Sequence, residues 1–159
     1  MERIHSIDAD VYIGYSLGGL LLLKVSEQLA GKQCILIAGF ADLRKDSGRG
    51  GRYSAKEIKA IKLNLRRNPQ AAINNFYSNF GIGLECTSLD DYDLGELAWG
   101  LTVLANESYD QPIPENVYAY LGEDDLLIDC HQVAKDFPNS KILPDAGHGL
   151  LDYLPQIEL

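Results

Sequence analysis

The sequence has few cysteines, a deficit of positive charge and no long apolar run, and each shortage excludes a class of protein. Its three cysteines form no Cys-x-x-Cys spacing, so we expect neither a disulfide framework nor a structural zinc site. The net charge of -9 argues against a nucleic-acid or membrane-surface protein. No apolar run reaches the ~18 residues of a membrane span, and no basic-then-apolar signal peptide opens the chain. We therefore expect one cytoplasmic domain that needs no metal and no other cofactor.

The most informative segment is residues 11–19, which read Val-Tyr-Ile-Gly-Tyr-Ser-Leu-Gly-Gly. The apolar start predicts a strand, the spacing Gly14-x-Ser16-x-Gly18 predicts a sharp turn, and the leucines that follow predict a helix. This is the pattern of a nucleophile elbow, in which a strained turn projects a serine hydroxyl and the two glycines allow close packing. The amide of Leu17 would then begin a helix and donate a hydrogen bond to an oxyanion. The alternative is a chance spacing of glycine and serine.

Alternating patterns along the chain predict a parallel α/β sheet interrupted by a group of helices. The predicted strands are residues 11–13, 34–38, 117–121 and 141–143. The predicted helices are 18–30, 54–67 with Ser54 as its N-cap, 69–77, one or two within 89–106, 129–135 with Asp129 as its cap, and 149–154. We expect residues 1–41 and 110–159 to form the sheet-bearing core, and residues 42–109 to form a helical cap.

Two further segments follow predicted strands and supply the other groups that a serine nucleophile needs. The loop after the third strand carries Asp124 and Asp125, and we favour Asp125 as the inward-facing acid because apolar residues follow it. The alternative is that both aspartates are solvated turn residues. His148 follows the fourth strand with a glycine on each side. The order Ser16, Asp125, His148 is the chain order of the α/β-hydrolases and differs from that of other serine hydrolases.

The cap segment is basic although the chain as a whole is acidic. Nine basic and three acidic residues lie between Asp42 and Arg67. Helical spacing predicts that Lys56, Lys59, Lys62 and Arg66 share one helix face, and together with Arg52 they form a candidate surface for an acidic partner. An ordinary solvated helix face is the alternative. The cap also holds four aromatic residues that line a pocket or form the cap's own core: Phe76, Tyr77, Phe80 and Trp99.

These motifs together resemble the α/β-hydrolase superfamily and, within it, the esterases that hydrolyse the methyl ester of pimeloyl-acyl carrier protein in biotin synthesis. The resemblance is carried by residues 14–19, the strand 35–38, Asn75-Phe76-Tyr77, Gly122-x-x-Asp125 and Ala146-Gly147-His148. It implies a serine carboxylesterase in which Ser16 attacks the acyl carbon, His148 transfers the proton and Asp125 orients the imidazole. It also implies that basic cap residues receive the acyl carrier protein.

The sequence departs from this family at its start. The family has several strands before the nucleophile strand, including the loop that donates a second oxyanion-hole amide, whereas about twelve residues precede the elbow here. We therefore expect the C-terminal portion of the fold, with about four strands. We also expect the unpaired edge of the apolar first strand to favour homodimerisation. Three other functions stay open: an acyl thioesterase, an acyltransferase, or a catalytically weak form that acts as a binding module.

Overall fold

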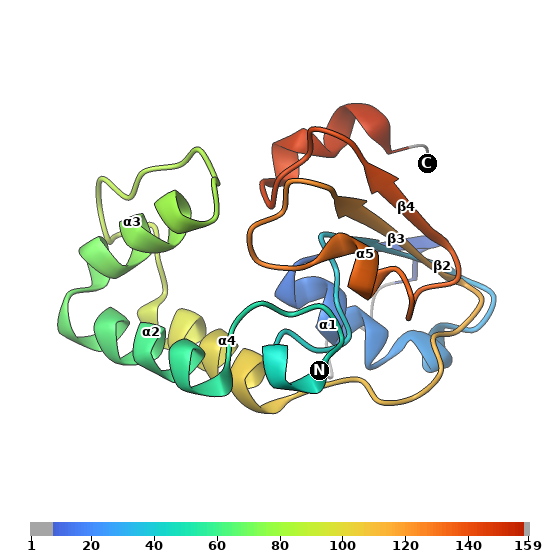
Figure 1. The fold of residues 1–159 in the computed structure, drawn as a ribbon, viewed down its shortest axis with the longest axis horizontal. Coiled ribbons are helices and arrows are strands. Elements are labelled where there is room, and N and C mark those ends of the chain that lie inside the picture. Colours follow the sequence, from blue (N-terminus) through green and yellow to red (C-terminus); the bar gives the residue numbers. More distant parts are fainter. Residues whose placement is uncertain (1–7, 158–159) are drawn as a thin grey trace.

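The computed structural model describes residues 8–157, and its centre is a four-stranded parallel sheet (Figure 1). The strands follow one another in chain order: β1 (Val11–Tyr15), β2 (Gln33–Ile37), β3 (Val117–Gly122) and β4 (Ser140–Leu143). Their register places Gly14 opposite Leu36 and Leu36 opposite Ala119. All four strands run the same way, so their carboxyl ends lie at one edge of the sheet, where the predicted site residues follow them.

The burial of the strands follows their composition. β2 is apolar and its residues Cys34–Ile37 are buried, as expected for an inner strand of a parallel sheet. β1 lies at one edge of the described sheet, and Ile13 on it is 50% exposed. Homodimerisation through this strand stays a prediction. Residues 1–7 and 158–159 of the predicted core lie outside the described residues.

The helix predicted over residues 18–30 is wrong in its length. α1 (Leu17–Leu23) ends after seven residues, and a 3₁₀-helix (Ser26–Leu29) follows it. The Ser26 hydroxyl donates a hydrogen bond of 2.7 Å to the Leu23 carbonyl, which takes the place of the backbone bond that would continue the helix. The turn lets the chain reverse towards β2 within a few residues.

The two helices predicted after β3 are also shorter than expected. α5 covers Cys130–Val133, and the amides of Lys135, Asp136 and Phe137 bond three residues back, so the segment continues as turns before Pro138. The region predicted as a helix over 149–154 forms two 3₁₀-helices, Leu150–Asp152 and Leu154–Gln156. Its irregular backbone comes directly after the loop that carries His148.

The helical insertion between β2 and β3 begins with a 3₁₀-helix (Lys45–Ser47) and contains α2 (Ala55–Arg67), α3 (Pro69–Asn79) and α4 (Leu94–Asn106). Ser54 and Glu57 form a capping box at the start of α2, as the N-cap prediction implies. The predicted region 89–106 gives one helix, which begins at Leu94 because the Asp93 carboxylate accepts hydrogen bonds from the next amides.

The insertion lies beside the sheet-bearing part rather than over its centre (Figure 1). α2 packs against both α3 and α4. Leu65, Ala72, Ile73 and Cys86 form a small buried cluster within the insertion. The division of the chain at 41/42 and 109/110 stays a prediction. Among residues 8–157, no helix has the length and apolar character that a bilayer span requires.

Candidate active site

Ser16 occupies a strained turn between β1 and α1. Its φ of 51° and ψ of −118° lie outside the regions that ordinary L-residues prefer. The turn is fixed by the Ser16 amide, which donates to the Ile37 carbonyl of β2 at 2.9 Å. The Ser16 side chain makes no capping bond to α1, so its hydroxyl projects away from the helix. This is the geometry that the glycine spacing predicts.

The close packing around the turn depends on Gly14, and the expected contribution of Gly18 is wrong. A Cβ atom at Gly14 would lie 2.6 Å from the Gly18 carbonyl oxygen, which belongs to the backbone and has little freedom to move. A Cβ atom at Gly18 would have no atom within 4 Å beyond its chain neighbours and the backbone of α1 itself. The Gly18 backbone is the obstacle that requires glycine at position 14, while position 18 itself has room for a side chain.

His148 lies within hydrogen-bond distance of Ser16, with its Nε2 atom 3.0 Å from the Ser16 Oγ atom. It is 1% exposed and sits on the loop after β4. Two tyrosine hydroxyls hold this loop: Tyr15 donates to the His148 carbonyl at 2.7 Å and Tyr153 donates to the Gly147 carbonyl at 2.8 Å. No pattern in the sequence singles out either tyrosine, although Tyr15 stands next to Ser16 in the chain.

Asp125 completes the arrangement, because its Oδ2 atom lies 2.7 Å from Nδ1 of His148. Its other oxygen accepts hydrogen bonds from the amides of Leu127 at 2.7 Å and Ile128 at 3.2 Å. Asp125 is 1% exposed, whereas Asp124 is exposed. The inward-facing acid is therefore Asp125, and the alternative that both aspartates are solvated turn residues is wrong.

This geometry defines what the three side chains can do. A carboxylate that accepts the Nδ1 proton leaves the Nε2 lone pair directed at the serine hydroxyl, which is the orientation needed to remove the hydroxyl proton. The loops that follow β3 and β4 approach each other closely at Gly122, where a Cβ atom would lie 2.6 Å from the Gly147 carbonyl oxygen. The amide of Leu17 is the first of α1, and it precedes the first amides that have an acceptor at this end of the helix, those of Gly19 and Leu20, which donate to the Ser16 carbonyl. Its role as oxyanion donor stays a prediction.

Burial keeps the two supporting tyrosines protonated. Burial, and then the charge of Asp125, raise the pKa of Tyr15 to about 12. The same two causes raise the pKa of Tyr153. A protonated phenol donates a hydrogen bond, so both hydroxyls continue to hold the loop of His148 well into the alkaline range.

No cluster of three His, Cys, Asp or Glu side chains within residues 8–157 has an arrangement that fits a metal ion.

Two cavities meet at Ser16. The first, of about 230 Å³, lies between α1 and the insertion helices and is lined mainly by apolar side chains. The second, of about 580 Å³, is lined by His148 and the residues after it. Phe76 and Tyr77 line both cavities. Of the other two aromatic residues, Phe80 is buried in the core and Trp99 is 50% exposed.

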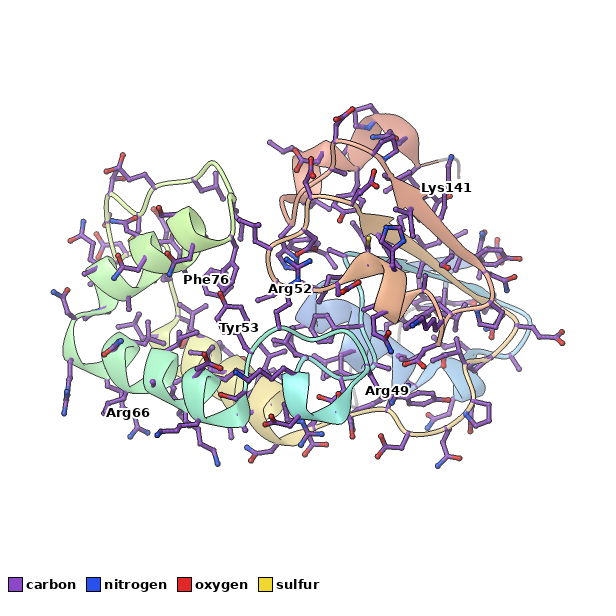
Figure 2. The ribbon with its side chains drawn as sticks, in the orientation of Figure 1. Arg49, Arg52, Tyr53, Arg66, Phe76 and Lys141 are labelled. Carbon is purple, nitrogen blue, oxygen red and sulfur yellow. The ribbon has the colours of Figure 1, made fainter. Side chains whose placement is uncertain are left out.

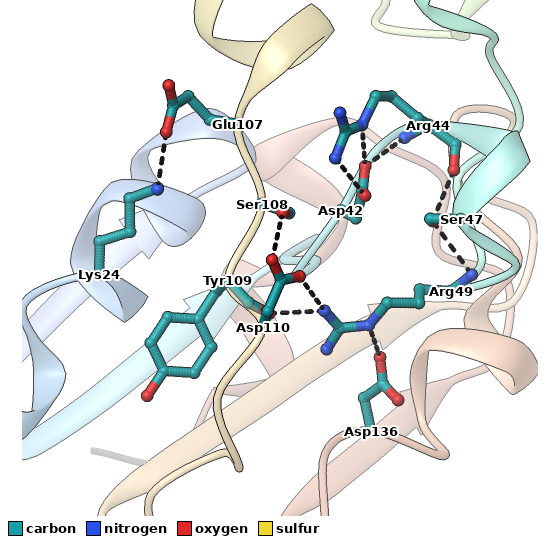
Figure 3. Close-up of polar contacts among 10 residues, drawn as sticks. All are labelled: Lys24, Asp42, Arg44, Ser47, Arg49, Glu107, Ser108, Tyr109, Asp110 and Asp136. Carbon is teal, nitrogen blue, oxygen red and sulfur yellow. Dashed lines mark hydrogen bonds and ion pairs between the residues drawn. The ribbon is translucent and has the colours of Figure 1, made fainter.

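The basic residues of the cap segment differ in their surroundings. Three of them are paired: Arg44 with Asp42, Arg49 with Asp136 and Asp110, and Lys45 with Glu57. Figure 3 shows the pairs of Arg44 and Arg49 beside the segment that leads to β3. Four residues of the predicted docking set are exposed: Arg52, Lys56, Lys59 and Arg66.

Lys62, the fifth residue of the predicted set, departs from the expected outward orientation. It is partly buried, and its ammonium group donates to the Thr102 hydroxyl of α4. Arg66 lies on α2 at the far end of the insertion, on the opposite side of the molecule from Lys141 of β4 (Figure 2). The docking roles of Lys62 and of the four exposed residues stay a prediction.

No model of a known protein family matches this sequence, and no curated protein sequence matches it. Solved structures do resemble it. An esterase from Exiguobacterium antarcticum aligns with a TM-score of 0.57 at 13% identity over 97% of this chain and 64% of its own. An esterase from a Rhodococcus species gives 0.54 at 16% identity, over 91% and 60% of the two chains. A hydrolase from Oleispira antarctica gives 0.53 at 13% identity, over 92% and 60%.

The sheet, the helical insertion and these neighbours define the fold: the chain has a parallel-sheet α/β-hydrolase fold, as the sequence predicts. The chain spans 60% to 64% of the length of these three neighbours. At identities of 13% to 16%, the similarity concerns the fold. The chemistry must therefore be argued from the side chains of this chain.

Proposed function

We propose that this protein is a carboxylic ester hydrolase with Ser16 as its nucleophile. The observation that carries the proposal is the chain of hydrogen bonds from Ser16 Oγ through His148 to Asp125, with distances of 3.0 Å and 2.7 Å. The similarity of the fold to two esterases supports the same reaction. No cofactor has a part in it.

The proposed reaction has two halves. His148 Nε2 accepts the Ser16 proton as Oγ bonds to the acyl carbon, and the tetrahedral oxyanion accepts a hydrogen bond from the Leu17 amide. The imidazolium then gives that proton to the leaving alkoxide oxygen, which departs as the alcohol. In the second half, water loses a proton to His148 and attacks the acyl-serine. The carboxylic acid leaves, and Ser16 recovers its proton from the imidazolium.

Replacement of Ser16 by alanine tests the proposal. We expect wild-type protein to hydrolyse p-nitrophenyl butyrate with saturation kinetics, and the Ser16→Ala variant to lose at least about 10³-fold in kcat because the covalent route is gone. Ser78→Ala is the matched control, because Ser78 is exposed on α3 and lines neither cavity at Ser16. Equal hydrolysis by wild type and Ser16→Ala would refute the proposal.

A finer proposal concerns the substrate. We propose that the ester is carried by an acidic acyl carrier protein and is the methyl ester of a pimeloyl chain, as in biotin synthesis. The support is the family resemblance of the motifs and the four exposed basic residues of the insertion, which no ion pair of the described residues neutralises. Attraction between opposite charges at exposed positions accelerates association, and salt weakens this attraction.

Charge reversal tests the carrier. Lys59→Glu combined with Arg66→Glu should reduce kcat/KM for the carrier-bound ester by about tenfold at low salt, and leave a small free ester unaffected. The control reverses Lys135 and Lys141, which are exposed on the sheet-bearing part. Equal loss on both substrates would exclude a docking role. Faster cleavage of an acyl thioester than of its oxygen ester would identify a thioesterase, and acyl transfer to an added alcohol would identify an acyltransferase.

A further inference from the structure

The two cavities at Ser16 differ in which catalytic group lines them, and this assigns them to the two halves of an ester. His148 lines the larger cavity and not the smaller one. The imidazolium must reach the leaving oxygen to protonate it, so the alcohol half belongs on the side of His148. Leu17, whose amide is the predicted oxyanion donor, lines the smaller cavity. The acyl chain therefore extends into the smaller cavity.

The smaller cavity suits an apolar chain of limited length. Leu65, Ala72 and Ile73 line it and are buried, and no lysine or arginine is among its lining residues. Its volume is about 230 Å³. This space accommodates an alkyl chain of several carbon atoms.

One carboxylate lines this otherwise apolar cavity. Glu96 belongs to the first turn of α4, and Gly100 and Leu104 follow it at four-residue intervals along the same lining. Gly100, the middle of these three residues, lies against Leu17, because a Cβ atom there would lie 2.9 Å from the Leu17 side chain. Four residues of helix rise by about 6 Å, so Glu96 lies one turn of α4 away from this contact. No ion pair of the described residues neutralises its charge.

We infer that the smaller cavity binds the acyl chain of the substrate, and that Glu96 makes it reject chains that end in a free carboxylate. This inference rests on the proposed ester hydrolysis. Glu96 is exposed, so water screens the repulsion, and we expect about a fivefold preference for a neutral chain over its anionic counterpart. A chain joined to a carrier by a thioester is neutral at its far end, whereas the free half-ester of a diacid is anionic. Glu96 would therefore favour carrier-bound diacid esters over free ones.

The test measures binding in Ser16→Ala protein, where no turnover interferes. Isothermal titration compares methyl heptanoate with monomethyl pimelate, which has the same chain length and a terminal carboxylate. We expect the neutral ester to bind about fivefold more tightly, and the added change Glu96→Gln to bring the ratio within twofold. Glu115→Gln is the matched control, since it removes the same charge from an exposed position that lines neither cavity at Ser16.

The outcomes separate this inference from the proposed function. Equal affinities for the two esters, no binding of either ester, or a ratio that Glu96→Gln leaves unchanged would overturn the inference. Hydrolysis of methyl heptanoate by wild-type protein is measured alongside. If wild type fails to hydrolyse it while the Glu96-dependent ratio persists in binding, the proposed function is wrong and the charge selection of the cavity stands.

Discussion

Replacement of Asp125 by asparagine is the change whose effect the geometry specifies most fully. Oδ1 of Asp125 accepts two hydrogen bonds from the amides of Leu127 and Ile128, and Oδ2 faces Nδ1 of His148 at 2.7 Å. The two backbone donors require an oxygen at the Oδ1 position. An asparagine must therefore place its NH₂ group against Nδ1.

An NH₂ group at that place stabilises the wrong tautomer of His148. Nδ1 becomes the acceptor, Nε2 carries the proton, and the imidazole cannot remove the proton of Ser16. Such a change in a Ser-His-Asp arrangement typically lowers kcat by about 10⁴, which corresponds to about 5.4 kcal/mol in the barrier. The fold should persist, because asparagine retains a hydrogen-bond partner for each of the three groups that contact Asp125.

The assay is hydrolysis of p-nitrophenyl butyrate, with the thermal unfolding midpoint measured on the same samples. Asp124→Asn is the matched control, since Asp124 is the exposed neighbour of Asp125. We expect kcat to fall by about 10⁴ in Asp125→Asn and to remain within twofold of wild type in Asp124→Asn. A folded Asp125→Asn variant that retains a tenth of wild-type kcat would refute the reasoning, and so would an equal loss in both variants.

Three further changes have defined outcomes. Tyr15→Phe removes the donor to the His148 carbonyl and should lower kcat several-fold. Because the pKa of Tyr15 is raised to about 12 in the folded protein, the free energy of unfolding of the wild type should fall between pH 10 and pH 12. Urea unfolding should show a shallower fall for Tyr15→Phe over the same range. Ser54→Ala removes the N-cap of α2 and should lower the free energy of unfolding by about 1 kcal/mol, whereas an unchanged midpoint would contradict the capping role. Gly14→Ala should prevent folding or abolish hydrolysis and Gly18→Ala should be tolerated, so the reverse order would contradict the described turn.

Local signals in the sequence were sufficient for the strands and for most of the site. The apolar runs predict each strand to within two residues, and Ser54 and Pro69 predict the starts of α2 and α3 because capping depends on neighbouring residues alone. Asp125 could be preferred over Asp124 for a similar reason, since the apolar residues after it indicate which side faces inward.

The features that the sequence did not predict depend on contacts that form only in the folded chain. The bond from Ser26 to the Leu23 carbonyl ends α1 early, although serine is otherwise acceptable within a helix. Tyr15 holds the histidine loop from β1, and Tyr153 holds it from the 3₁₀ segment that follows it. Glu96 reaches the cavity only because α4 packs beside α2. Position 18 has room for a Cβ atom, which the spacing of the motif does not reveal.

Covalent labelling of Ser16 tests the central claim most directly. A fluorophosphonate probe reacts with a serine hydroxyl that a neighbouring base activates, and mass spectrometry of the digested protein locates the adduct. The account predicts one adduct on the peptide that contains Ser16, and labelling at least about 10²-fold slower in His148→Ala, because the base is gone. An unlabelled Ser16, or labelling as slow as at the exposed Ser78, would contradict it.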